Sequence, residues 1–347
     1  MWSVGFTTIK DSYLWSMDLV TGGTGIVGRE LLSQLLSKGR KVRALKRPSS
    51  DVDGVETFIK AQGVSTTNLS WVNGDTREFD EVCEAIDGCS RVYHLAALVS
   101  FHPSEEPLLM EINKGGTANV VNAMLEKGIL DLVYVSSVAA LGHTLKKPIT
   151  EETDFQEGPL ITAYSRSKYE SELEVWRGQE EGLSVLILNP SIIIGEGDFS
   201  RSSGELFSQS AKGIPVFPAG ENGFVSAKDV ASACLALAES GIRGERFLLN
   251  AENISYKDAM GAIAHSVGAK PPTKIVNGWM ISLVVFMFAA LEFFTGRKSM
   301  ANKVSMKMAQ LKTHYDGSKI LRRLDGWKYE SVQTAIDRAG KAYLESA

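Results

Sequence analysis

The segment Ala163-Tyr-Ser-Arg-Ser-Lys168 places a phenol and an amine four residues apart. On a helix, Tyr164 and Lys168 share one face and can meet over a bound ligand. A phenol with a pKa near 10 is a poor base at neutral pH, and moving that pKa to about 7 requires roughly 4 kcal/mol. One ammonium group at about 5 Å supplies roughly 3 kcal/mol at an effective dielectric constant near 20. The pair therefore predicts proton transfer, with Tyr164 as the acid towards a carbonyl or the base towards an alcohol.

Two serines follow the apolar run Leu132-Val-Tyr-Val135, which predicts a strand over residues 131–136. Ligands of open α/β folds bind at the carboxyl ends of the strands, so Ser136 and Ser137 lie at the expected edge. A hydroxyl group there can orient the reacting oxygen. Neither signal is specific alone, because a Tyr-x-x-x-Lys spacing also occurs on surface helices and serines also end strands without any chemical role.

A glycine-rich turn, Thr21-Gly-Gly-Thr-Gly-Ile-Val-Gly28, separates the first predicted strand from the first predicted helix. The glycines at positions 22, 25 and 28 allow a tight turn, a close approach of phosphate to the backbone, and close packing of the helix on the sheet. The helix N-terminus then offers unpaired N–H groups and about +0.5 charge to a pyrophosphate. Since the Lys-Ser/Thr of a P-loop is absent, the turn predicts dinucleotide binding.

The second predicted strand ends in Lys46-Arg47-Pro48, where an NAD-binding protein would usually place a carboxylate on the ribose hydroxyls. A forked guanidinium suits a 2′-phosphate and gains nothing from a neutral ribose. The sequence therefore favours NADP(H), with NAD as the alternative. Asp75, which follows the third predicted strand, is expected either to accept from the adenine amino group or to serve as an ordinary turn residue.

The elements that must position these residues alternate along the first two-thirds of the chain. Short β-rich runs and helical patterns follow one another, which predicts an α/β fold with a doubly wound parallel sheet. Strands are expected at 19–21, 42–46, 69–73, 91–95, 131–136 and 184–188. Helices are expected from Ile26 to Gly39 and at 80–86, 113–127 and 163–181.

Beyond Pro190 the alternation loosens, and Gly and Ser accumulate in two stretches that predict long loops. A helix is expected at 228–239 and a strand at 246–249, and Ser255-Tyr-Lys-Asp258 is a capping box that opens another helix. We therefore expect a Rossmann-type dinucleotide-binding domain over 17–189. A smaller substrate-binding lobe over 190–347 would interleave with it, and residues 1–16 would form an extension before the second methionine, Met17.

Composition excludes several classes of protein. The 37 Lys and Arg against 41 Asp and Glu give a net charge of −4, which argues against a nucleic-acid partner. Three cysteines, Cys83, Cys89 and Cys234, form no Cys-x-x-Cys pair, so a reducing, cytoplasmic location is expected. Five histidines show no His-x-x-x-His spacing, and no metal site is expected.

Residues 279–294 form the most apolar run, which Glu292 interrupts. The run is shorter than the 20 or so apolar residues that a bilayer requires. A buried or lid helix is therefore favoured. The alternative, a helix lying in a membrane surface, is kept open by the basic residues that follow it.

The motifs occur in one fixed order: the glycine turn, Tyr93-His-Leu-Ala-Ala97, Asn113, the two serines, Tyr164-x-x-x-Lys168, and Asn189-Pro190. From about residue 18 to residue 343, this order resembles the extended short-chain dehydrogenase/reductase family. Within that family the chain is most similar to the dihydroflavonol 4-reductase and 3β-hydroxysteroid dehydrogenase branch, together with bacterial NAD-dependent epimerase/dehydratase-like proteins.

The resemblance implies a Rossmann fold and a catalytic Ser–Tyr–Lys set. Ser137 matches the family's serine because it lies five residues before Gly142. The implied catalytic residues are Ser137, Tyr164, Lys168 and Asn113, the last matching the family's helix-four asparagine. The implied cofactor-binding residues are Gly22, Thr24, Gly25, Ile26, Gly28, Arg47, Asp75, Thr76, Ala96, Ala97, Ser136, Tyr164, Lys168, Pro190 and Ile193.

The chain departs from the family pattern in two places. Asp18 occupies an apolar position of the first strand, and Leu141 replaces a tyrosine, which argues against a sugar epimerase. Apolar residues such as Val99, Phe101 and Leu108 indicate an apolar or aromatic substrate.

Three hypotheses follow. The first is an NADP(H)-dependent oxidoreductase that interconverts a carbonyl and an alcohol on a small molecule, acting as a monomer or homodimer. The second is a nucleotide-sugar epimerase or dehydratase that retains its NAD. The third is a non-catalytic dinucleotide-binding protein.

Overall fold

A computed structural model describes residues 17–144, 147–200, 202–276 and 303–346. In this part of the chain, seven parallel strands form one sheet in the order β10-β6-β5-β4-β1-β2-β3. The strands are β1 (Met17–Thr21), β2 (Lys41–Lys46), β3 (Leu69–Asn73), β4 (Cys89–His94), β5 (Asp131–Val135), β6 (Ser184–Pro190) and β10 (Glu245–Leu249). The predicted doubly wound fold is confirmed, and all six strands predicted before residue 190 lie in this sheet.

The strand order reverses beside β1, which pairs with β2 on one side and with β4 on the other. Thr21, the last residue of β1, aligns with His94, the last residue of β4. The connections that follow these two strands run to opposite faces of the sheet. The carboxyl ends of β1 and β4 therefore form the crevice in which folds of this kind bind their ligands.

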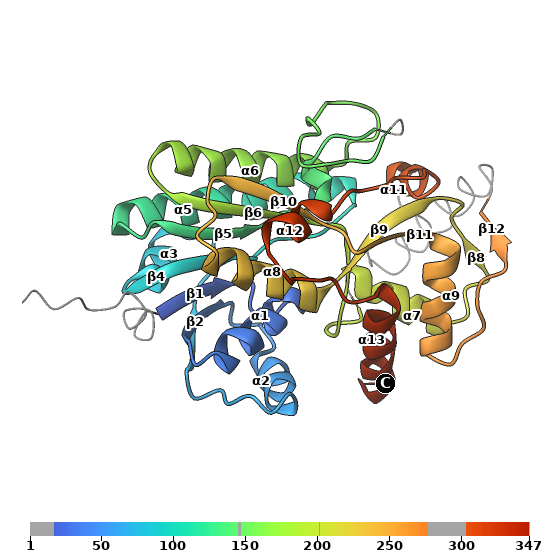
Figure 1. The fold of residues 1–347 in the computed structure, drawn as a ribbon, viewed down its shortest axis with the longest axis horizontal. Helices are drawn as coiled ribbons and strands as arrows, with labels where there is room; N and C mark the ends of the chain where they lie inside the picture. Colours follow the sequence, from blue (N-terminus) through green and yellow to red (C-terminus); the bar gives the residue numbers. More distant parts are fainter. Residues whose placement is uncertain (1–16, 145–146, 201, 277–302, 347) are drawn as a thin grey trace, which may run out of the picture.

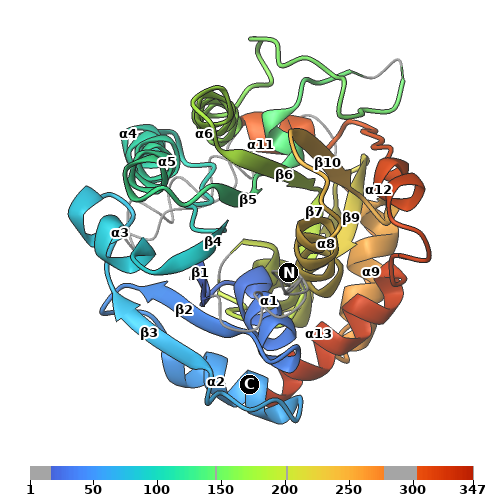
Figure 2. The ribbon, with the colours of Figure 1, turned by 60° about the vertical axis from the view of Figure 1, so that its left-hand side comes forward.

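Helices cover both faces of the sheet (Figure 2). One layer holds α1 (Ile26–Ser37) and α8 (Ala227–Glu239), which pack against each other, with α2 (Val52–Ala61) beside α1. The other holds α3 (Phe79–Ile86), α5 (Gly116–Lys127) and α6 (Ala163–Glu180). Each layer closes its own apolar core: Leu31, Val230 and Phe247 lie in one, and Val82, Val121 and Val175 in the other.

The C-terminal elements pack to one side of the central sheet (Figure 1). A second sheet has the order β11-β9-β7, with β7 (Ile192–Ile194), β9 (Glu221–Ser226) and β11 (Glu252–Ser255). A two-stranded sheet joins β8 (Val216–Phe217) to β12 (Lys274–Ile275). The helices are α7 (Glu205–Ala211), α9 (Tyr256–Ser266), α11 (Lys303–Met308), α12 (Ser318–Arg323) and α13 (Val332–Ser346). The chain passes between the two parts, since β10 returns to the central sheet.

Two elements before residue 190 differ from the sequence-based expectation. Helix α2 was not predicted, although Asp51 caps it by accepting from the Gly54 amide. The helix predicted over 113–127 is a regular α-helix only from Gly116, after the short α4 (Glu106–Leu109) and a wide π-helical turn at Met110–Gly115. The Asn113 side chain in this turn binds the backbone of Leu98.

Asp18, the unusual residue of the first strand, is fully buried in β1. Its two carboxylate oxygens accept from Nε and Nη2 of Arg40 at 2.8 and 2.7 Å. Burial raises the pKa of Asp18, and the Arg40 guanidinium opposes that rise. The strand therefore tolerates a carboxylate because a forked, charged partner lies 22 residues further along the chain.

The predicted extension 1–16 and the apolar run 279–294 lie outside the described residues. None of the helices described here is long and apolar enough to span a bilayer. The capping box at Ser255 is confirmed, since its hydroxyl accepts from the Asp258 amide at 3.1 Å and opens α9.

Candidate functional site

Each glycine of the turn after β1 meets a different requirement. Gly22 has φ +73°, and a methyl group added there would lie 2.6 Å from the Ala96 amide nitrogen. A methyl group on Gly28 would lie 2.2 Å from the Gly22 carbonyl oxygen, so α1 could not begin so close to the turn. Gly25 is exposed, and a methyl group there would meet only the Gly22 oxygen, at 3.4 Å. Contacts with protein atoms therefore exclude a side chain at Gly22 and Gly28, whereas Gly25 faces open space.

The N-terminus of α1 lacks the partners that usually satisfy such a helix end. Gly25 is its N-cap residue, no side chain caps it, and the first turn holds no acidic residue. The unpaired N–H groups therefore face the carboxyl edge of the sheet beside the open glycine. This arrangement fits the pyrophosphate of a dinucleotide, because backbone donors and the positive end of the helix favour an anion there. Thr24 lies half-buried in the same turn, and Ile26 begins the helix.

The ends of β2 and β3 carry the residues expected around the adenosine. Arg47 is exposed directly after β2, and its guanidinium makes no hydrogen bond or ion pair within the described residues. Asp75 follows β3, where its two oxygens already accept from Arg77 at 3.1 and 2.9 Å. These bonds lower the pKa of Asp75. An adenine amino group would therefore share this carboxylate with Arg77.

The catalytic residues expected from the resemblance meet at the carboxyl ends of β4 and β5. Tyr164 and Lys168 lie on the first turns of α6, capped by Thr162, whose hydroxyl accepts from the Ser165 amide at 3.0 Å. Ser137 begins the short 3-10 turn that follows β5. Burial raises the pKa of Tyr164, and both the Lys168 ammonium and the Ser137 hydroxyl act to lower it. In the cofactor-free chain, burial outweighs these two neighbours.

The Lys168 ammonium is fully buried and fixed from two sides. Its Nζ donates to the Tyr134 hydroxyl at 2.8 Å and to the Val135 carbonyl at 3.1 Å. It also lies 4.6 Å from the centre of the Tyr134 ring. Burial lowers the pKa of Lys168, while the charges of Tyr164 and Glu172 act to raise it. Sequence reasoning missed Tyr134, because it reads as an apolar strand residue.

Asn113 holds the backbone around the site. Its Nδ2 donates to the Leu98 carbonyl at 2.9 Å and to the Ser167 hydroxyl at 2.9 Å, and its Oδ1 accepts from the Leu98 amide at 2.7 Å. Ser167 in turn donates to the Tyr164 carbonyl at 2.9 Å. Asn113 therefore joins the segment after β4 to the first turn of α6.

The remaining residues expected to contact the cofactor lie along the same edge of the sheet. The Ala96 amide donates to the Thr21 hydroxyl at 3.2 Å, which holds the segment after β4 beside the glycine turn. The others follow or end β3, β4, β5 and β6: Thr76, Ala97, Ser136, Pro190 and Ile193. The fold thus brings most of the expected residues to the carboxyl ends of the central strands, with Ile193 in β7 of the second sheet, although they are spread over about 170 positions of the sequence.

A buried hydrogen-bonded chain behind this edge was not predicted. His94 contacts the Thr21 hydroxyl through Nδ1 at 2.7 Å and the Thr117 hydroxyl through Nε2 at 3.1 Å. Burial lowers the pKa of His94 to about 3, so the ring is neutral and serves to pack the sheet edge. Its polar partners come from β1 and α5, which no local spacing could reveal.

An aromatic ring packs against Tyr164, and two exposed aliphatic side chains lie on the same segment of the chain. The Phe101 ring lies edge-on to the Tyr164 ring, with centroids 5.6 Å apart. Val99 and Leu108 are 38% and 36% exposed, which is unusual for large aliphatic side chains. These three residues come from the segment between β4 and α5, and of them Phe101 packs against the phenol ring.

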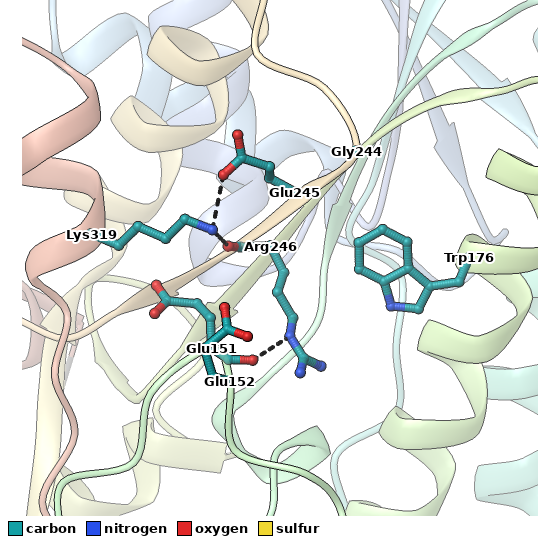
Figure 3. A pocket seen from close by; sticks show the side chains of 7 residues that line it. All are labelled: Glu151, Glu152, Trp176, Gly244, Glu245, Arg246 and Lys319. Carbon is teal, nitrogen blue, oxygen red and sulfur yellow. Dashed lines mark hydrogen bonds and ion pairs between the residues drawn. The ribbon is translucent and has the colours of Figure 1, made fainter.

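A cavity of about 400 Å³ lies elsewhere, at the start of the edge strand β10 (Figure 3). Arg246, Glu245 and Lys319 line it together with Trp176 of α6. Lys319 pairs with Glu245 at 3.0 Å, and Arg246 binds the Glu151 carbonyl through Nε at 2.8 Å. Its cations are therefore paired within the protein. Arg246 is level with Ile187 of β6 and, through it, with Tyr134 of β5, three residues before Ser137.

Comparison with known proteins identifies the class. A sequence model of the NAD dependent epimerase/dehydratase family matches residues 19–249. The chain belongs to this family, within the extended short-chain dehydrogenases/reductases. It is an NAD(P)-dependent enzyme of that type, and the resemblance inferred from its motifs is confirmed.

Individual relatives cover nearly the whole chain. A protein of Synechocystis sp., provisionally named as a dihydroflavonol 4-reductase, is 30% identical over 91% of each chain. Sterol demethylase protein B of Methylococcus capsulatus is 30% identical over 88% of this chain and 92% of its own. The crystal structure of gox2253 superposes with a TM-score of 0.78 at 26% identity, covering 95% of this chain and 98% of its own.

Proposed function

We propose that this enzyme uses NADP(H) to interconvert a carbonyl and an alcohol on a small apolar or aromatic substrate. One observation carries the proposal: the buried phenol of Tyr164 and the buried ammonium of Lys168 lie beside Ser137. They lie at the same carboxyl end of the strands as the glycine turn, whose helix has no side-chain cap. The reductase name of one relative supports an oxidoreductase. The substrate is a small molecule, and no nucleic-acid partner is expected from the net charge of −4.

The chain's own residues would handle the oxygen and its proton. Bound NADPH supplies hydride to the carbonyl carbon. The hydroxyls of Ser137 and Tyr164 would hold the carbonyl oxygen, and Tyr164 would donate its proton as the alcohol forms. Lys168 would stabilise the resulting phenolate, since its ammonium acts to lower the pKa of Tyr164. In oxidation, the same phenolate would accept the proton of the alcohol.

The preference for NADP(H) is supported by the charge at the end of β2. Arg47 is exposed, and its guanidinium makes no hydrogen bond or ion pair within the described residues, although its charge acts on Asp75. No carboxylate lies at that position of the sequence. A guanidinium can bind a 2′-phosphate with two parallel, charged hydrogen bonds. The apolar substrate class is supported by Phe101, whose ring packs edge-on to the phenol, and by the exposed Val99 and Leu108 of the same segment.

The proposal also covers the compartment, the oligomeric state and the membrane contact of the enzyme. The three cysteines are unpaired and buried, which supports a reducing, cytoplasmic compartment. We expect a monomer or a homodimer. Membrane contact through residues 279–294 stays the less favoured alternative to a buried or lid helix.

The decisive experiment compares Tyr164→Phe with wild type on a panel of aromatic aldehydes and ketones with NADPH. We expect kcat to fall about 10²- to 10⁴-fold, the usual contribution of a general acid. Tyr169→Phe, which alters a tyrosine of the same helix that stacks on Phe155, is the matched control and should stay active. Undiminished turnover in Tyr164→Phe would rule the mechanism out. Wild-type conversion of a nucleotide-sugar without net NADPH consumption would instead favour an epimerase or dehydratase.

A further inference from the structure

The proposed catalytic set comes from two separate elements whose relative position must be fixed. Tyr164 and Lys168 lie on α6, whereas Ser137 lies on the turn after β5. Asn189, the residue before the last of β6, lies between them. Its Nδ2 donates to the Ser137 carbonyl at 3.0 Å and to Oε1 of Glu172 at 2.5 Å. A single amide group thus joins the serine turn to α6.

Glu172 belongs to the same helical face as the catalytic pair. It follows Lys168 by four residues and Tyr164 by eight, so the three side chains lie one above another on α6. The residue is 2% exposed. Its second oxygen, Oε2, lies 3.4 Å from Nη1 of Arg246, the residue that also borders the cavity of Figure 3. Because a buried carboxylate requires such partners, its position is determined from both sides.

The serine turn is held by bonds within itself and by bonds to its neighbours. The Ser137 carbonyl accepts from the Ala140 amide at 3.0 Å, and the Ser137 hydroxyl accepts from the Ala139 amide at 3.1 Å. Both bonds are internal to the turn, so they shape it without placing it. Asn189 ties the turn to α6 through Glu172, and the hydroxyls of Ser136 and Ser137 also interact with Glu172 and Tyr164 of that helix. The Ser136 amide ties the turn to β6 through the Leu188 carbonyl at 2.7 Å.

The orientation of the Asn189 amide supports a role beyond packing. Both hydrogen atoms of Nδ2 are used, one by a carbonyl and one by a carboxylate. Its Oδ1 is buried and finds no hydrogen-bond donor in the described part of the chain. Leaving a buried polar atom unpaired is unfavourable. The amide is therefore oriented by the two acceptors that it joins.

We propose that Asn189 and Glu172 are positioning residues that hold Ser137 in register with Tyr164 and Lys168. The inference rests on the proposed function, because it assigns these two residues to the same reaction. A displacement of about 1 Å in a reacting group can reduce turnover about 100-fold. The Glu172 carboxylate has a second effect, since its charge also acts to raise the pKa of Lys168 and so favours the ammonium form.

The test uses the full chain and two readouts. The variants are Asn189→Ala and Glu172→Ala, which remove the bridge, and Glu172→Gln, which keeps an acceptor for Asn189. In the cofactor-free protein, hydrogen exchange is measured at the Ala139 and Ala140 amides, which bind the oxygens of Ser137. With NADPH, kcat and the Kd of the cofactor are measured on the best carbonyl substrate of wild type.

We expect both alanine variants to exchange these two amides at least about tenfold faster, because local opening of the turn becomes easier. Their kcat should fall about 10- to 100-fold. The Kd of NADPH should change less than about threefold, because an interaction that acts only on the reacting groups lowers kcat without weakening cofactor binding. Glu172→Gln should restore slow exchange and regain part of the lost kcat, because it keeps the acceptor for Asn189 but not the charge beside Lys168. The matched control is Glu174→Ala, which removes a surface ion pair to Arg177 on the same helix and should match wild type.

The inference would be overturned if the amide exchange rates and kcat of Asn189→Ala stayed within about twofold of wild type. An equal loss of kcat in Glu174→Ala would overturn it as well. If Asn189→Ala does not fold, the isosteric Asn189→Asp, which cannot donate to both acceptors, takes its place with the same expected losses. The exchange readout needs no substrate. A wild-type protein that reduces no carbonyl would count against the proposed function, while the exchange data would still decide whether the bridge holds the turn.

Discussion

The β1–α1 turn and the corner formed by β5, β6 and α6 both lie at the carboxyl ends of the central strands, but they are built in opposite ways. At the β1–α1 turn, the candidate cofactor site consists of backbone atoms, because its three motif residues are glycines: Gly22, Gly25 and Gly28. At the corner formed by β5, β6 and α6, the site consists of buried side chains that bind one another, such as Lys168 with Tyr134. Under the proposed function, the turn would accept a ligand through its open space and unpaired donors, whereas the corner would prepare a proton donor by fixing its neighbours.

This difference decides what the sequence could predict. The glycine turn is local, so a spacing of three residues between strand and helix reveals it. The parallel sheet was also predictable, because each strand is a short apolar run between helical patterns. Asn113, Ser137, Tyr164 and Lys168 came from motifs in a fixed order, and the fold brings them to one edge.

The supporting contacts could not be predicted in the same way. Glu172 lies 17 positions from Asn189, and nothing in either segment indicates that they meet. Asp18 was noted as unusual, but its partner Arg40 became evident only from the pairing of β1 with β2. The short strands β7, β8 and β9 were missed because they owe their conformation to tertiary pairing, not to local pattern.

The comparison is tested most severely by Gly28→Ala and Gly25→Ala. A methyl group on Gly28 would lie 2.2 Å from the Gly22 oxygen, so we expect a loss of about 1–3 kcal/mol in the free energy of unfolding and a large loss of cofactor affinity. Gly25→Ala should keep the stability, since its contact is 3.4 Å, yet weaken NADPH binding because the methyl fills the open space. Chemical denaturation and cofactor fluorescence titration measure the two effects.

Gly261→Ala is the control, because an added methyl group on α9 would have no neighbour within 4 Å. It should be at least as stable as wild type, since alanine favours a helix by up to about 1 kcal/mol. Tight NADPH binding by Gly25→Ala would contradict the assignment of that space to the pyrophosphate.

A smaller and more selective effect is expected from Arg47→Ala. Loss of a charged hydrogen bond, roughly 1.5–3 kcal/mol, should weaken NADPH binding about 10- to 100-fold. The Kd of NADH should not change, because NADH has no 2′-phosphate. Thermal shift with both cofactors measures this difference, since a ligand at 100 times its Kd adds about 2.7 kcal/mol. Lys60→Ala, which removes an exposed cation of α2, serves as the control.

Equal weakening of NADPH and NADH in Arg47→Ala would separate that residue from the 2′-phosphate. If NADH stabilised wild type more than NADPH does, the proposed preference for NADP(H) would be wrong. Either result would leave the glycine turn unaffected and restrict the correction to the end of β2.

At the corner formed by β5, β6 and α6, the Lys168 ammonium acts to lower the pKa of the Tyr164 phenol. The most direct test of this effect is the pH dependence of kcat/KM for alcohol oxidation in wild type and in Lys168→Met. The ammonium acts to lower the pKa of Tyr164, so its removal should raise that pKa further. Because oxidation requires the phenolate, the rise of kcat/KM with pH should move to higher pH in Lys168→Met. An unshifted profile, with only the amplitude reduced, would contradict the account.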